Sequence, residues 1–188
     1  MWQYRTRPPG LLVLSGSLPH SQVPPATTRV LGADQFPVRG KIPDGRHVVG
    51  DMGWNDDVIE KFRSSKGTEN YWGPKLIILH SIGAKSGETH LNPVVGFRNA
   101  NGWRVVASKG GTPENPAWYH NLRANPSFDI EALVDGEVVT VPVTATEIPA
   151  DQWHEAYNAI VAEESQFGDY LEKTDRRIPV LQLTPRTD

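Results

Sequence analysis

The sequence predicts a mainly β domain with flanking helices, an α+β fold in which antiparallel strands close into a barrel. Short apolar runs are joined by turn residues, most clearly at Asp135 and Gly136, and such turns connect antiparallel neighbours. Helical patterns interrupt these strands without alternating regularly with them, as a doubly wound parallel sheet would require. The sequence contains no internal repeat. An antiparallel barrel is therefore the fold we expect.

Composition excludes several classes of function. The 188-residue chain has a formal net charge of −3, so bulk electrostatics indicate no nucleic-acid partner. The absence of cysteine excludes disulfides, thiolate catalysis and Cys-ligated zinc, and the six histidines lack the H-x-H or H-x-x-x-H spacing of a metal site. No apolar run approaches the roughly 20 residues of a transmembrane helix, so we expect no integral membrane segment.

The first 51 residues differ in composition from the rest of the chain. Seven prolines recur among Gly, Ser and Thr without sustained periodicity, which is typical of disordered segments. Residues 10–18 faintly resemble the apolar part of a signal peptide, but the stretch is short and no clear cleavage site follows. We expect residues 1–51 to be a disordered arm or a segment upstream of the true start at Met52, and residues 52–188 to form one domain.

Strand segments share apolar, β-branched residues bounded by turn residues. They are expected at residues 75–82, 89–98, 103–108, 128–134, 138–146 and 178–183. The G-A-K-S-G segment at residues 83–87 is expected to be a turn, and Pro93 indicates an edge or a bulge in the second strand. His80 is expected to be a core or barrel histidine with a satisfied side chain.

Two amphipathic helices flank these strands. The first is expected from about Trp54, where acidic residues precede Val58, Ile59 and Phe62 at helical spacing. The second is expected over residues 151–164. Its apolar face is formed by Trp153, Ala156, Tyr157, Ile160 and Val161.

The stretch of residues 108–126 combines a glycine-rich strand end with a helix start. The paired glycines of S-K-G-G let backbone amides approach a ligand and adopt positive φ without strain. Asn115 is expected to cap a helix over residues 116–124, with Pro116 at its first position and Trp118 and Leu122 on one face. A lysine between these features indicates an anion site, although a tight turn before a surface helix would have the same pattern.

Four motifs together resemble the deazaflavin-dependent nitroreductase family. They are G-A-K-S-G, S-K-G-G, N-P-A-W-Y-H-N-L-R-A-N-P and T-D-R-R-I-P-V, and the resemblance runs from about residue 57 to residue 185. The family consists of actinobacterial split β-barrel proteins, with an FMN-binding-like fold, that use the deazaflavin coenzyme F420. The resemblance implies a cytoplasmic oxidoreductase that transfers a hydride from reduced F420 to a quinone, nitro or other unsaturated acceptor.

The resemblance also implies which positions hold the coenzyme. Basic groups and amides of the G-A-K-S-G turn would bind its phosphate and acidic tail, and the S-K-G-G strand end and the neighbouring strand would hold its ring. Trp118 and Asn121 match positions that pack the helix and fix its loop. The implied positions are Lys85, Ser86, Gly87, His90, Pro93, Val94, Val95, Ser108, Lys109, Gly110, Gly111, Asn115, Trp118 and Asn121.

Two departures from the family pattern lie beside the turn. Ala84 stands where family members commonly carry an arginine, and His90 stands near a position that is often basic. Because each charge-assisted contact to an anion contributes roughly 1.5–3 kcal/mol, we expect either weaker binding of the acidic tail or binding of the tail by Lys109 and Arg123 instead. FMN has no such tail, so an FMN-dependent reductase on the same barrel stays an alternative.

The acceptor side is expected at residues 164–170, before T-D-R-R-I-P-V. Tyr170 matches a family tyrosine and would orient the acceptor or donate a proton, whereas Phe167 replaces a second tyrosine and would only pack. This predicts poor turnover of nitroimidazoles. The segment Asp175, Arg176, Arg177 is expected to form a strand-anchoring ion pair.

A non-catalytic deazaflavin or flavin carrier is the competing function. A homodimer is possible, and a lipid quinone as acceptor would bring the enzyme to the membrane.

Overall fold

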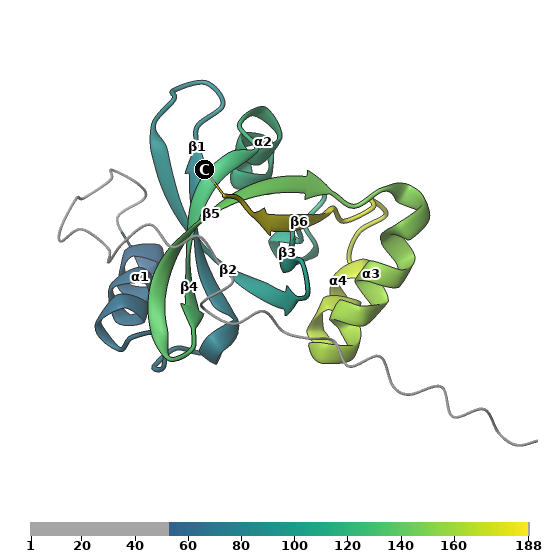
Figure 1. Cartoon of the computed structure of the whole chain (residues 1–188). Coiled ribbons are helices and arrows are strands. Elements are labelled where there is room, and N and C mark those ends of the chain that lie inside the picture. The colour runs from purple at the N-terminus through teal and green to yellow at the C-terminus, as the bar shows by residue number, and fades with distance from the viewer. Residues whose placement is uncertain (1–52, 188) are drawn as a thin grey trace, which may run out of the picture.

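The computed structural model describes residues 53–187, and the predictions for residues 1–51 lie outside this range (Figure 1). Strand and helix segments follow one another along the chain with short connections. In chain order they are α1 (Trp54–Ser64), the 3-10 turn η2 (Gly73–Lys75), β1 (Leu76–Ile82), β2 (Thr89–Asn99), β3 (Gly102–Val106), the 3-10 turn η3 (Lys109–Gly111), α2 (Ala117–Ala124), β4 (Ser127–Val134), β5 (Glu137–Glu147), α3 (Ala150–Glu163), α4 (Gln166–Glu172) and β6 (Val180–Pro185).

The six strands form a closed barrel in the order β1-β2-β3-β6-β5-β4, and β4 pairs back to β1. Every pairing is antiparallel. The hairpin between β4 and β5 turns at Asp135 and Gly136, which have φ of 51° and 84°, the left-handed conformation that a two-residue hairpin needs. The predicted antiparallel barrel with flanking helices is therefore confirmed, with β6 as the strand that completes it between β3 and β5.

Side-chain alternation along the strands divides the apolar residues between the barrel interior and its outer faces. The interior cluster includes Ile77 and Leu79 of β1 and continues into Trp118, Tyr119 and Leu122 of α2. Helix α2 therefore packs against the interior core, beside the end of β1 (Figure 1). This position brings the first turn of α2 next to the loop between β1 and β2.

The other helices cover outer faces of the barrel (Figure 1). Helix α1 packs Ile59 and Phe62 against β1, and α3 and α4 form a second cluster with β2, β3 and β6. Helix α4 was not predicted, because its short sequence contains Gly168 and buries only Phe167. No helix within residues 53–187 is long and apolar enough to cross a bilayer.

Two local predictions were wrong in part. Strand β2 is continuous, with Pro93 opposite Ile78 in an uninterrupted register, so there is no bulge at Pro93. Pairing of β2 with β3 begins only at Gly96, so Pro93 has β1 alone as its neighbour and its missing N–H disrupts no second ladder. Asn115 does not cap α2, because Pro116 is the N-cap residue and the Asn115 side chain accepts a hydrogen bond from Arg176.

A partly buried ion pair joins α1 to the barrel. The fully buried Glu131 of β4 accepts hydrogen bonds from Arg63 Nε at 2.9 Å and from Arg63 Nη2, and its Oε1 lies 2.8 Å from His80 Nε2. The prediction of a satisfied barrel histidine at position 80 is thus confirmed. Burial alone would raise the pKa of Glu131, but the hydrogen bonds and charge of Arg63 and His80 hold it below its ordinary value of 4.5.

We expect Glu131→Gln to lower the free energy of unfolding at pH 7 by about 2 kcal/mol, because Arg63 loses its charge partner while staying partly solvated. A depressed carboxyl pKa contributes stability above 4.5 and loses it as pH falls through the folded-state value. Urea denaturation at pH 7 and at about pH 3 should therefore show the difference from wild type shrinking in acid. Glu137→Gln, on an exposed β5 residue, is the control; a pH-independent difference would contradict this account.

Candidate functional site

A cavity of about 560 Å³ opens beside the loop between β1 and β2. Among the described residues it is lined by Gly83, Ala84, Lys85, Ser86, His90, Asn92, Ala117, Trp118, His120 and Asn121. This lining contains no carboxylate, and Lys85 is its one lysine or arginine. Amide, hydroxyl and imidazole groups supply the remaining polar surface. The cavity is therefore suited to an anionic ligand.

The turn that carries Lys85 is held in place from two sides. Gly83 N donates to Glu88 O at 2.8 Å, and Gly87 N donates to Gly83 O at 2.9 Å with Gly87 at φ 71°. From α2, the Asn121 side-chain oxygen accepts a hydrogen bond from Ala84 N at 3.0 Å. A Cβ atom added to Gly83 would lie 3.0 Å from His90 Nε2, so the turn lies close to the His90 side chain of β2. The turn is thus locked onto both α2 and β2.

A buried serine lies behind the cavity and is bonded to two residues that line it, Asn92 and Asn121. The buried Ser81 hydroxyl accepts hydrogen bonds from Asn92 Nδ2 at 3.0 Å and from Asn121 Nδ2 at 3.4 Å. Register pairs His90 with Ser81, and strand alternation puts Asn92 on the same face as His90. Each of these side chains is positioned by hydrogen bonding or by strand pairing.

Residues 108–115 have an unusual backbone, and we call them the coenzyme loop because the family resemblance predicts the coenzyme ring there. Lys109, Gly110 and Gly111 have φ of 48°, 66° and 83° in succession. An added Cβ on Gly111 would lie 2.9 Å from Tyr170 O and 2.9 Å from Lys173 Cβ, so this glycine packs directly against the backbone of α4. Residue 111 must be glycine for both reasons, because it has a left-handed φ and no space for a side chain.

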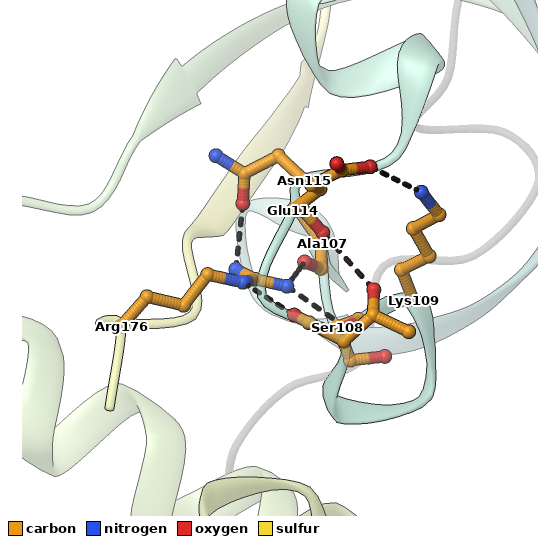
Figure 2. A network of polar contacts seen from close by, with 7 residues as sticks. Ala107, Ser108, Lys109, Glu114, Asn115 and Arg176 are labelled. Atoms are coloured by element: carbon orange, nitrogen blue, oxygen red, sulfur yellow. Dashed lines mark hydrogen bonds and ion pairs between the residues drawn. The ribbon is translucent and has the colours of Figure 1, made fainter. Parts of the chain in front are cut away.

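Arg176 binds this loop from the connection between α4 and β6 (Figure 2). Its Nε donates to Thr112 O at 2.9 Å and its Nη1 to Asn115 Oδ1 at 2.6 Å, while Nη2 donates to the carbonyls of Ala107 and Ser108 at 3.0 and 2.9 Å. Burial lowers the pKa of Arg176 from its ordinary value. Sequence reasoning expected an ion pair here; that is wrong for Arg176, whose acceptors are all neutral.

The neighbouring Arg177 does form an ion pair, with Glu147 at the end of β5 at 3.6 Å. The two adjacent arginines therefore point to different partners. The T-D-R-R-I-P-V motif was the signal available for Arg176, but sequence alone gives no way to connect it to a loop 61–68 residues earlier.

The predicted site residues fall into separate groups. Five of them line the cavity: Lys85, Ser86, His90, Trp118 and Asn121. Ser108, Lys109, Gly110, Gly111 and Asn115 belong to the coenzyme loop, outside the cavity lining. The Lys109 ammonium pairs with Glu114 Oε2 at 3.2 Å. The two groups adjoin along the chain, because the loop ends at Asn115 and Ala117, the first residue of α2, lines the cavity.

Strand β2 divides its predicted residues between two faces. Val94 packs with the barrel interior, whereas Val95 packs with the outer cluster that also contains Tyr170. Pro93 shares the outer face with Val95 by alternation. Gly87 closes the turn and does not line the cavity.

Some cavity residues were missed by sequence reasoning. Ala117 lies four positions before Asn121 on α2, His120 is adjacent to Asn121, and Asn92 lies two positions from His90 on β2. The spacings of Ala117 and Asn92 match one helix face and one strand face, so periodicity could have found these two residues, whereas it gives no signal for His120. Gly83 and Ala84 belong to the predicted turn itself.

Tyr170 lies where α4 meets the coenzyme loop. Its half-buried ring packs edge-on against Phe167 with centroids 5.3 Å apart, and Lys173 Nζ lies 5.5 Å from its ring centroid. Within residues 53–187 the Tyr170 hydroxyl has no hydrogen-bond partner. The hydroxyl is therefore not used in a hydrogen bond within this part of the fold, and its role toward an acceptor stays a prediction.

The closed antiparallel barrel and the carboxylate-free cavity define a class of β-barrel protein with a site suited to an anionic ligand. Comparison with known proteins identifies the family. The model of the F420H(2)-dependent quinone reductase family matches residues 54–185, and the chain belongs to this family.

Individual relatives agree with this assignment. The F420H(2)-dependent quinone reductase Rv1261c of Mycobacterium tuberculosis is 36% identical over 115 residues, which cover 60% of this chain and 75% of the relative. A solved F420-H2 dependent reductase, FDR-A, is 32% identical with a TM-score of 0.51 and covers 58% of this chain and 93% of its own. A structure described as a domain-swapped dimer is 32% identical with a TM-score of 0.53, covering 68% and 97%.

Family membership confirms the fold class, the enzyme class and the coenzyme that the motifs indicated. The protein is an oxidoreductase of the F420H(2)-dependent quinone reductase family, and its cofactor is F420. The residue assignments within the site stay predictions.

Substitution at the two adjacent glycines of the loop should separate backbone strain from the contact with α4. We expect Gly110→Ala to cost about 1 kcal/mol of unfolding free energy, because its φ of 66° is strained but no atom lies within 4 Å of the new Cβ. Gly111→Ala should cost about 1–3 kcal/mol more, because its Cβ also meets the backbone of Tyr170. Urea denaturation of the two variants measures the difference; equal costs would show that the contact with α4 is unimportant.

Proposed function

We propose that this chain transfers a hydride from reduced F420 to a quinone, with the coenzyme bound from the cavity, past the first turn of α2, to the coenzyme loop. The observation that carries the proposal is the continuity of these parts: a cavity without carboxylates, a helix start and a glycine turn in contact with α4. When bound, reduced F420 supplies the hydride from its ring carbon. The protein's own contribution is binding, orientation and exclusion of water.

In this proposal the cavity binds the phosphate and acidic tail. Lys85 contributes a full positive charge, and Ser86 and His90 contribute hydrogen-bonding groups. Asn121 holds the turn through Ala84 N, so these groups do not have to be ordered on binding. Ala84 offers no charge where family members commonly carry an arginine, which makes Lys85 the main electrostatic contact.

The ring side of the proposed site lies between the coenzyme loop and β2. Gly110 is exposed, and its position is open enough that nothing lies within 4 Å of an added Cβ. Ser108, Lys109 and Gly111 would hold the ring edge through the loop backbone, and Pro93, Val94 and Val95 belong to the strand behind it. Lys109 would have to leave Glu114 in order to contact an anion, which is easy for an exposed pair.

Tyr170 is the proposed contact with the acceptor. Its free hydroxyl could donate a hydrogen bond or a proton to a quinone oxygen as negative charge develops there. Phe167 is buried and edge-on to both Phe97 and Tyr170, so it has a packing role and offers no second hydroxyl. We therefore propose quinones as better acceptors than bicyclic nitroimidazoles.

We also propose a homodimer in the cytoplasm. The dimer is supported by the related structure described as domain-swapped. A lipid quinone as acceptor would require contact of this enzyme with the membrane surface.

Coenzyme titrations test the cavity assignment. Because Trp118 lines the cavity, tryptophan quenching should report F420 binding to the apoprotein, with FMN binding more weakly. Lys85→Ala should weaken F420 binding by about fivefold to tenfold, and Ala84→Arg should tighten it by a similar factor that shrinks at high salt. Lys61→Ala, on exposed α1, is the control. Tighter binding of FMN than of F420, or no effect at positions 84 and 85, would overturn the assignment.

The acceptor assignment is tested at Tyr170. Tyr170→Phe keeps the ring contacts and removes only the hydroxyl, so kcat with a soluble naphthoquinone should fall by about tenfold to a hundredfold while the KM for reduced F420 is unchanged. Tyr71→Phe, a residue 87% exposed in the segment before η2, is the control. A bicyclic nitroimidazole assayed alongside should react more slowly than the quinone. If quinone does not accelerate coenzyme oxidation by the wild type, a carrier role is favoured instead.

A further inference from the structure

We propose that Arg176 is a positioning residue that holds the coenzyme loop in its binding conformation and so sets the affinity for F420. The inference rests on the proposed coenzyme role of residues 108–115. Arg176 does not line the cavity, and the motifs did not predict it to be a binding residue.

The contacts of Arg176 reach both ends of the loop (Figure 2). The carbonyls of Ala107 and Ser108 lie where the chain leaves β3, and Thr112 O and Asn115 Oδ1 lie where it approaches α2. The planar guanidinium therefore bridges the two ends across the turn at residues 109–111. A single side chain from the α4–β6 connection therefore links the end of β3 to the segment before α2.

The loop has few stabilising contacts of its own. Its backbone hydrogen bonds are Gly111 N to Ser108 O at 3.0 Å and Thr112 N to Lys109 O at 3.3 Å. Its side-chain contacts, the Thr112 hydroxyl to Glu114 O at 3.2 Å and the ion pair between Lys109 and Glu114, are exposed. The positive φ of Lys109 costs a non-glycine residue roughly 1–2 kcal/mol. Such a conformation persists only where surrounding structure imposes it, and Arg176 makes four of the hydrogen bonds that do so.

The chemistry at this position requires the shape of arginine and not only its charge. All four acceptors are neutral, and within the described residues no carboxylate lies within ion-pair distance of the guanidinium. A lysine would keep the positive charge, but its single ammonium cannot reach acceptors at both ends of the loop. The conservative substitution therefore separates positioning from electrostatics.

The same contacts couple the loop to the acceptor side. Gly111 packs on the backbone of Tyr170, and Arg176 follows α4 by four residues, so α4 and the coenzyme loop are joined at two points. Loss of one point leaves the loop free to sample other conformations. Apparent affinity then falls in proportion to the fraction of molecules in the binding conformation, because only these bind the coenzyme.

The test compares Arg176→Lys with Arg177→Lys in the full-length protein. Arg177 is the matched control, since it is adjacent, exposed and paired with Glu147 outside the loop. Without coenzyme, hydrogen exchange of the amides at residues 109–112 should become about tenfold faster in Arg176→Lys, while β1 amides are unchanged. The Kd for F420 should rise by about tenfold and kcat at saturating reduced F420 should stay within about threefold. Arg177→Lys should match wild type in each measurement.

The outcomes separate this inference from the proposed function. Unchanged exchange in the loop of Arg176→Lys, or equal acceleration in β1, would overturn the positioning role. Faster loop exchange with no change in F420 binding would instead refute the coenzyme role of the loop. If Arg176→Lys does not fold, Asn115→Ala decides, because it removes one of the four acceptors: about threefold faster loop exchange supports the inference, and unchanged exchange overturns it.

Discussion

Closure of the barrel is the constraint on which the rest of this structure depends. Once β4 pairs with β1, each strand has one face turned to the interior, and that interior must be apolar except where it reaches the end of the barrel. Ser81, His90 and Asn92 lie at that end, on the inward faces of β1 and β2. Helix α2 packs beside them, so His90 and Asn92 line a cavity, and the buried Ser81 hydroxyl is satisfied by Asn92 and Asn121.

Much of this arrangement could be predicted from sequence, because it depends on local chemistry. The Asp135–Gly136 turn determined the longest hairpin, and the glycines of G-A-K-S-G determined a turn that α2 then fixes through Asn121. Cavity residues such as His90 and Lys85 belong to the same short segments. For these residues, family motifs and backbone preferences point to the same places.

The features that sequence did not predict are those decided by contacts between distant segments. Asn115 has the residue type of a helix cap, yet its side chain binds Arg176, which lies 61 residues later. Pro93 breaks no ladder only because β3 begins its pairing three residues beyond it. Helix α4 has little periodicity of its own and is held by Phe167 in the outer cluster and by the turn at Gly111. In each case tertiary packing outweighs the local preference.

Arg176 and Arg177 show why residue type alone cannot assign such roles. They are chemically identical neighbours, yet the chain direction before β6 turns one toward Glu147 and the other toward the loop carbonyls. An exposed ion pair contributes little, since water and salt screen it and two long side chains must be ordered. A partly buried guanidinium with four neutral acceptors loses hydration that only those acceptors replace, so its geometry is strongly determined. The loop carbonyls fix the position of the guanidinium, and the guanidinium in turn fixes the conformation of the loop. Together these contacts hold the glycine turn next to α4, and none of them involves the cavity.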